Sequence, residues 1–198
     1  MKPYTAHTFE IPELNGISAK TIQEHIKLYQ GYVKNANLII EKIAEYMADS
    51  EKNAYVLGEL QRRFAFEFCG MRNHEYYFHA LEGGAKPLSA DASLRAAIES
   101  QAPSFEAWLA GFKAIAMTRG IGWAILAWDD KTQQLTHSWV DEQHLGQLTG
   151  VTPVLMLDMW EHSYLMDYTP GEKKNYVEAF FANLNWETIE QNFVEAKK

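Results

Sequence analysis

The N-terminal part of the chain carries the apolar spacing of two long helices. Apolar side chains recur every three or four residues over about 19–47, and Ser18 stands where a helix N-cap is expected. A second run with the same period covers about 54–81 and stops at Gly83-Gly84, a pair typical of a helix C-terminus. Because only a short polar turn separates the two runs, the pattern predicts a helical hairpin.

Beyond the hairpin the period of the pattern changes. Two further helical runs come first, the second starting from a Ser104 cap, and short apolar runs closed by turn residues then indicate strands. The expected elements are helices over 90–100 and 104–118, strands over 123–128, 135–140 and 153–157, and a helical tail over 171–193. The pattern therefore predicts an α+β fold: an N-terminal long helical hairpin domain over residues 1–86, then a mixed α/β domain with a small antiparallel sheet over residues 87–198.

Composition narrows the classes of function. The 18 basic residues against 26 acidic ones leave a formal charge of −8 and form no basic run, so we expect no nucleic acid partner. No apolar stretch approaches the roughly 18 residues of a membrane span, and the first residues lack a secretion signal, so we expect no membrane association. The single cysteine, Cys69, excludes an internal disulfide and fits a reducing, cytoplasmic location.

A carboxylate and an imidazole stand four residues apart directly after the last predicted strand, at Asp158 and His162. A strand end commonly opens into a cleft, where such a pair can hold a first-row metal ion, although a helix-capping Asp and a half-buried His would look the same. His25 and His74 lie on the apolar sides of the two hairpin helices, where a lone His is usually an ordinary core residue. Together the four would supply three nitrogen ligands and one oxygen ligand, but periodicity does not show whether they meet.

With these residues in view, the chain resembles the iron/manganese superoxide dismutase family. The segment from Asp158 to Tyr164 reads D-M-W-E-H-S-Y and matches that family's D-x-W-E-H-x-Y signature. Similar motifs follow the family order along nearly the whole chain: Phe9 to Leu14 (F-E-I-P-E-L), Ile17 to Thr21, His25 with Tyr32-Val33 and Asn37, Asn73-His74, Gly120 to Trp123 (G-I-G-W), and Asn185-Trp186. The resemblance implies a helical hairpin followed by an α/β domain, with a metal ion between them.

The resemblance also implies a ligand set and a reaction. It makes His25, His74, Asp158 and His162 the protein ligands of one manganese or iron ion per subunit, with solvent as a fifth ligand. It implies that the ion cycles between the +3 and +2 states, oxidising one superoxide to dioxygen and reducing a second to hydrogen peroxide. Three neutral imidazoles and one carboxylate can hold the ion in both states, and bound hydroxide would take up a proton on reduction.

The same resemblance assigns roles around the ligands. Tyr32 matches the tyrosine of the substrate channel, and Gln143 falls where manganese-type members carry the glutamine that contacts the bound solvent. A shift of one residue would place His144 there instead, so Tyr32, Gln143 and His144 are the expected catalytic side chains. The other implied neighbours are two pocket-wall aromatics and two residues of a homodimer interface: Trp123, Trp160, Glu161 and Tyr164. The implied assembly is a homodimer or a higher homo-oligomer.

The sequence also carries positions that bear on the choice of metal and departures from the family. The iron-type pattern has Gln four residues before the second-helix ligand, where this chain has Gly70, so the resemblance favours manganese and leaves use of both metals open. Leu28 stands where a second channel residue, a histidine, is common, and the stretch from His25 to Tyr32 is one residue shorter. One residue turns a helix by about 100°, so a helix bulge of the common form must be absent or altered.

Two other functions remain open at this point. A metal hydrolase would use the ion to activate water, but no additional general base stands beside the expected ligands. A non-catalytic metal-binding member of the same fold would account for Leu28 and the shortened first-helix motif. Metal bound without superoxide turnover would favour the non-catalytic interpretation, and cleavage of a phosphate ester or a peptide would favour the hydrolase.

Overall fold

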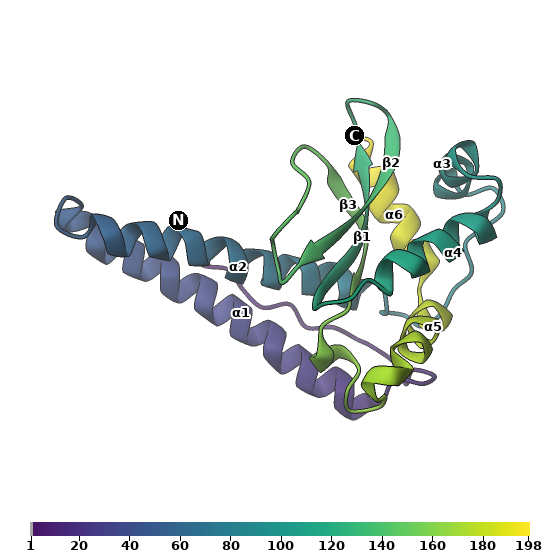
Figure 1. Cartoon of the computed structure of the whole chain (residues 1–198), viewed down its shortest axis with the longest axis horizontal. Coiled ribbons are helices and arrows are strands. Elements are labelled where there is room, and N and C mark those ends of the chain that lie inside the picture. Colours follow the sequence, from purple (N-terminus) through teal and green to yellow (C-terminus); the bar gives the residue numbers. More distant parts are fainter. Residues whose placement is uncertain (1) are drawn as a thin grey trace.

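The computed structural model describes residues 2–198, and its most extended part is the helical hairpin (Figure 1). Its two arms are α1 (Ala19–Tyr46) and α2 (Ala54–His79), joined by the short helix η1 (Met47–Asp49) and a turn. The Ser18 hydroxyl accepts a backbone amide hydrogen bond and caps α1. The hairpin predicted from the apolar spacing is confirmed, with helix ends that differ by two residues at most.

A three-stranded antiparallel sheet forms the centre of the α/β domain. Its strands, in the spatial order β2-β1-β3, are β1 (Gly122–Asp129), β2 (Gln134–Asp141) and β3 (Thr152–Asp158). The central β1 is buried along almost its whole length, which explains its continuous apolar run. The register pairs Trp123 with Asp158, so the start of β1 and the end of β3 meet at the same end of the sheet.

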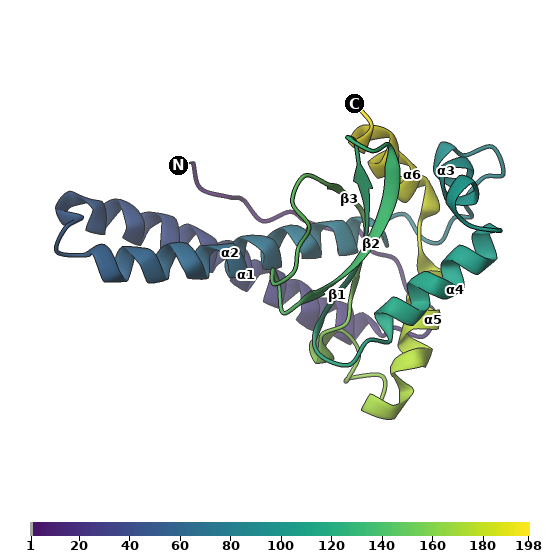
Figure 2. The same ribbon diagram turned by 45° about the horizontal axis from the view of Figure 1, so that its top comes forward.

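Helices precede and follow this sheet. They are α3 (Ser93–Gln101), α4 (Phe105–Ala116), η2 (Glu161–Ser163), η3 (Pro170–Glu172), α5 (Lys173–Asn183) and α6 (Trp186–Ala196). In both views the sheet and α3 to α6 lie toward one end of the hairpin, whose other end projects away from them (Figures 1 and 2). α2 packs against β3 and α1 contacts η2, so the hairpin lies against the segment that leaves the last strand. Within residues 2–198, none of the helices combines the length and the apolar character that crossing a bilayer requires.

The helical tail predicted over 171–193 divides into two helices at Leu184-Asn185. The Asn185 backbone amide donates to the Ala80 carbonyl at 2.8 Å, and the Lys86 amide donates to the Leu184 carbonyl at 3.0 Å. The Asn185 side chain then accepts a backbone hydrogen bond and caps α6. These bonds tie the tail to the end of the hairpin, and the backbone at Leu184 must be extended to make them.

Candidate metal centre

Four side chains from four separate elements converge where the hairpin meets the end of the sheet. His25 comes from α1, His74 from α2, Asp158 from the last position of β3, and His162 from η2. One potential ligand atom from each residue lies within 4.8 Å of the others. The structure thus brings together all four side chains that were expected to ligate the metal.

The carboxylate of Asp158 lies at the centre of this group. Its Oδ2 atom is 3.0 Å from Nε2 of His25, 3.1 Å from Nε2 of His162 and 3.5 Å from Nε2 of His74. Three of the four side chains are fully buried, whereas His162 keeps 21% of its side-chain surface exposed. Three imidazoles and one carboxylate form a donor set that suits a first-row transition metal.

A hydrogen bond on the far side of His74 fixes which nitrogen faces the group. Its Nδ1 lies 2.5 Å from the Gly70 carbonyl oxygen, so Nδ1 carries the proton and donates it. Nε2 is then a buried lone-pair atom with no hydrogen-bond partner within residues 2–198. A buried lone pair that faces a carboxylate oxygen at 3.5 Å is unfavourable unless a cation binds both atoms. The residues present therefore fit a metal ion.

Burial and charge set the protonation of the group. Burial lowers the pKa of His74 from its ordinary 6.5 to about 3, and it also lowers the pKa of His25 against the opposing hydrogen bond to Asp158. Burial alone would raise the pKa of the Asp158 carboxyl, but His162 and His25 together lower it well below its usual range. The group therefore presents an ionised carboxylate to two buried, neutral imidazoles, which is the form that ligates metals.

Hydrogen bonds hold the segment that carries Asp158. Its Oδ1 accepts from the Trp160 amide at 2.8 Å, and its backbone carbonyl accepts from the hydroxyls of Tyr176 at 2.8 Å and Ser163 at 3.2 Å. Because the backbone occupies Oδ1, Oδ2 is left to face the imidazoles. The residue pattern does not indicate these roles, because Tyr176 lies on an apolar helix face and Ser163 in the short helix η2 that follows the last strand.

A buried chain of hydrogen bonds lies beside the four side chains. Trp123 Nε1 donates to Gln143 Oε1 at 2.9 Å, and Gln143 Nε2 donates to the Tyr32 hydroxyl at 3.0 Å. Asn73, which sequence reasoning did not single out for this role, donates from Nδ2 to the Gln143 backbone carbonyl at 3.0 Å. The ring of His74 lies 5.1 Å from that of Tyr32 and 5.0 Å from that of Trp123, between centroids. These hydrogen-bonded side chains therefore enclose one face of the candidate centre.

The loop between β2 and β3 determines which of two neighbouring side chains, Gln143 or His144, joins this chain of hydrogen bonds. Glu142 adopts a left-handed φ of 52°, and its carbonyl accepts from Trp160 Nε1 at 3.0 Å. Gln143 is consequently buried, while the His144 ring packs against Phe66 at a centroid distance of 5.8 Å. The structure does not bring His144 into the four-residue group or into the hydrogen-bond chain.

Helix α1 brings Tyr32 to the centre without interruption. It is α-helical throughout, and the seven residues from His25 to Tyr32 make almost two full turns, so both side chains share one face. Gly70 on α2 leaves space for the ring, because a Cβ atom at residue 70 would lie 2.6 Å from Cδ1 of Tyr32. The helix bulge of the longer family spacing is absent from α1.

The remaining residues expected around the centre lie in contrasting surroundings. Trp160 stacks on the ring of His162 at a centroid distance of 5.7 Å and so forms a wall of the site. Glu161 is exposed. Tyr164 is buried, with its ring 5.5 Å from that of Tyr176. Glu161, unlike Tyr164, therefore offers its carboxylate to solvent or to another chain.

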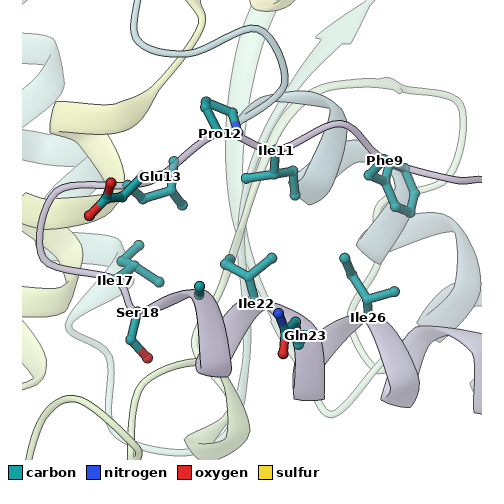
Figure 3. Close-up of a pocket in the computed structure, with 11 residues that line it drawn as sticks. Phe9, Ile11, Pro12, Glu13, Ile17, Ser18, Ile22, Gln23 and Ile26 are labelled. Atoms are coloured by element: carbon teal, nitrogen blue, oxygen red, sulfur yellow. The ribbon is translucent and has the colours of Figure 1, made fainter.

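A separate groove of about 590 Å³ lies between α1 and the N-terminal segment (Figure 3). Ile22 and Ile26 of α1 point across it toward the segment that carries Phe9 and Ile11. Among the described residues that line it, Glu13 carries the one charged side chain. The groove lacks convergent polar groups, so the candidate functional site is the four-residue group and not this groove.

Both parts of the chain match known family models. The model described as iron/manganese superoxide dismutases, alpha-hairpin domain, matches residues 3–82, and the model described as iron/manganese superoxide dismutases, C-terminal domain, matches residues 90–192. The superoxide dismutase (Fe) of Aquifex pyrophilus is 35% identical over 190 residues, which cover 93% of this chain and 88% of the relative. The superoxide dismutase (Mn/Fe) of Aeropyrum pernix is 31% identical over 209 residues (95% and 92%), and the superoxide dismutase (Mn) of Mycolicibacterium smegmatis is 34% identical over 175 residues (87% and 82%).

Proposed function

This chain belongs to the iron/manganese superoxide dismutase family, and we propose that it converts superoxide to dioxygen and hydrogen peroxide at a single metal ion held by His25, His74, Asp158 and His162. The observation that carries the proposal is the convergence of three imidazoles on one ionised carboxylate, with Nε2 of His74 buried and unpartnered within residues 2–198. A bound manganese or iron ion would supply one-electron chemistry by alternating between the +2 and +3 states. The single negative charge of the donor set is compatible with both states.

The proton that peroxide formation requires would be held by the hydrogen-bonded side chains of Trp123, Gln143 and Tyr32. Because Gln143 Nε2 donates to the Tyr32 oxygen, the Tyr32 hydroxyl keeps its own proton free to donate. Burial and the nearby charge of Asp158 raise the pKa of Tyr32, so this proton stays on the oxygen at neutral pH. We assign to Tyr32 the role of proton donor and to Gln143 the role of orienting the Tyr32 hydroxyl.

Manganese is the metal that we propose. The buried amide beside the ligands comes from Gln143 in the loop before β3, and residue 70 on α2 has neither a side chain nor space for one. This arrangement corresponds to the manganese-type pattern of the sequence. The relatives are named for iron, for manganese or for both, so similarity to them does not decide the metal.

We also propose that the protein functions as a homodimer. Glu161 adjoins the expected ligand His162 and is exposed in the single chain. Leu28 on α1, a helix that contacts η2, and Leu165 and Met166 just after η2 are exposed apolar side chains. A second copy that covered this region would bury them and give Glu161 a partner. Light scattering should show a dimer, and Glu161→Ala should weaken it; a monomeric wild-type protein would contradict the proposal.

We infer a cytoplasmic location from cysteine use. Cys69 is the single cysteine of the chain and is a free, half-buried thiol whose pKa is raised by burial. Such a thiol is unreactive and requires no oxidising compartment. Cell fractionation tests the inference, and a secreted pool of the protein would contradict it.

The test of the function is reconstitution of the apoprotein separately with manganese and with iron. Metal content and superoxide dismutation are measured on the same samples, so that activity is expressed per bound ion. We expect turnover with manganese and about tenfold less with iron, an effect of the size that groups around a metal ion produce. Stoichiometric metal without dismutation would refute the function and leave a non-catalytic metal-binding protein. Equal activity with both ions would refute the preference for manganese alone.

A further inference from the structure

Two histidines outside the metal centre face each other where the N-terminal segment passes the end of α2. His7 Nδ1 lies 3.4 Å from His79 Nε2, and the ring centroids are 5.7 Å apart. Neither residue belongs to the four-residue group. Two imidazole nitrogens bound to one tetrahedral zinc ion lie about 3.3 Å apart, given zinc–nitrogen distances of about 2.0–2.1 Å. The spacing of this pair is therefore already that of two adjacent ligands.

A carboxylate behind His79 holds its ring in the orientation that metal binding requires. His79 Nδ1 lies 2.5 Å from Glu82 Oε2, so Nδ1 donates its proton there and Nε2 presents a lone pair toward His7. Glu82 is itself fixed, because its Oε1 accepts from the Glu10 amide at 2.7 Å. A carboxylate that accepts the second ring proton is the arrangement that orients histidine ligands in zinc sites.

The position of His7 is fixed through its backbone. Its amide donates to the Tyr29 hydroxyl at 2.8 Å, and that hydroxyl donates to Glu75 Oε1 at 3.1 Å. Phe9 packs against both imidazoles, with its ring centroid 6.2 Å from that of His7 and 5.1 Å from that of His79. Metal binding requires that the ring proton of His7 move from Nδ1 to Nε2 and that the exposed His7 ring turn its Nδ1 lone pair toward the ion.

We propose that His7 and His79 form a second metal site, distinct from the redox centre, for a divalent late first-row ion such as Zn²⁺. Imidazole ligands favour zinc, copper and nickel over manganese, so the two sites would take different metals. A cavity of about 350 Å³ adjoins the pair and leaves room for water ligands. Because the ligands come from the N-terminal segment and from the end of α2, the ion would cross-link these two segments.

Zinc titration of the holoprotein tests the proposal, since zinc has no redox chemistry that could be mistaken for dismutation. The redox centre is loaded first, and both metals are then counted in the same desalted samples. We expect one zinc per chain with the resident metal unchanged, and loss of this zinc in His7→Gln and in His79→Gln. Glu82→Gln should weaken zinc binding about tenfold to a hundredfold. His137→Gln is the matched control, because His137 accepts a hydrogen bond from Trp108 and lies outside the pair.

Three results would overturn the proposal. No zinc uptake would mean that the two imidazoles only hydrogen-bond to each other. Unchanged zinc affinity in His7→Gln and His79→Gln would place the zinc elsewhere, and zinc gained only as the resident metal leaves would mean exchange at the redox centre. Hydrogen exchange adds an independent measurement: zinc should slow exchange around His7 in the wild type and not in His79→Gln. Resident metal retained in each variant shows that the fold is intact.

Discussion

Replacing Gln143 with alanine should reduce superoxide turnover far more than metal content. The side chain links Trp123 to Tyr32 through two hydrogen bonds and is not one of the four converging residues. Gln143→Ala removes both bonds, so the Tyr32 hydroxyl loses the donor that orients it. The three imidazoles and the Asp158 carboxylate remain, so the ion should still bind.

The expected losses of stability and of turnover follow from the hydrogen bonds and the burial of Gln143. Loss of the hydrogen bond to Tyr32 costs about 1 kcal/mol, and leaving the indole N–H of Trp123 without an acceptor costs about 1–3 kcal/mol. The vacated space adds a further cost unless water fills it. We therefore expect the free energy of unfolding to fall by about 2–5 kcal/mol. Turnover per bound metal should fall about tenfold to a hundredfold, as for other groups that hydrogen-bond around a metal centre.

His144→Ala is the matched control for this variant. It changes the next residue of the same loop, whose ring contacts Phe66 instead of the hydrogen-bond chain. Metal per chain, turnover per bound metal and thermal unfolding are measured for both variants and the wild type. His144→Ala should keep wild-type turnover. Equal losses of turnover in the two variants, or full turnover in Gln143→Ala, would refute the role given to Gln143.

Three further predictions concern the ligand His162, the contact between Gly70 and Tyr32, and the buried imidazole of His74. His162→Ala removes one of four ligands and should abolish most metal binding; full occupancy by elemental analysis would contradict the ligand assignment. Gly70→Ala places a Cβ atom 2.6 Å from Cδ1 of Tyr32, so the ring must shift and turnover per bound metal should fall, whereas wild-type turnover would show that the ring position does not matter. The apoprotein should be fully stable above about pH 6.5 and lose stability as the pH falls toward 3, because unfolded His74 takes up a proton that the folded chain excludes. Urea unfolding of the apoprotein at about pH 7 and about pH 5 measures this, and equal midpoints would refute it.

Local patterns in the sequence predict the elements of this fold but not all of their junctions. The period of apolar residues predicts both hairpin helices, because each buries one continuous stripe. The same period conceals the break between α5 and α6, since apolar residues continue through Trp186. The break exists because the Asn185 amide bonds to the Ala80 carbonyl, a contact between segments far apart in the chain. The preference of Asn for helix N-caps is a local signal at Asn185 that the apolar period does not include.

The same division between local and distant information applies to the candidate site. His25 and His74 could be placed on apolar helix faces, but their meeting with Asp158 depends on the packing of α2 on β3 and of α1 on η2. The orientation of Gln143 and His144 depends on the left-handed backbone of Glu142, a conformation that a non-glycine residue seldom adopts. A pattern of residue types does not contain either piece of information.

The short spacing in the first helix, the glycine at residue 70 and the glutamine of the β2–β3 loop are linked through the position of one ring. Seven residues turn a regular helix by about 700°, only about 20° short of two turns, so Tyr32 faces the same way as His25. An eighth residue would rotate Tyr32 by about 100° unless the helix bulged, and α1 has no bulge. The ring then lies so close to Gly70 that a side chain there would displace it. A glutamine on α2 at that position is therefore incompatible with this placement of Tyr32, and the amide that bonds to its hydroxyl comes from Gln143 instead.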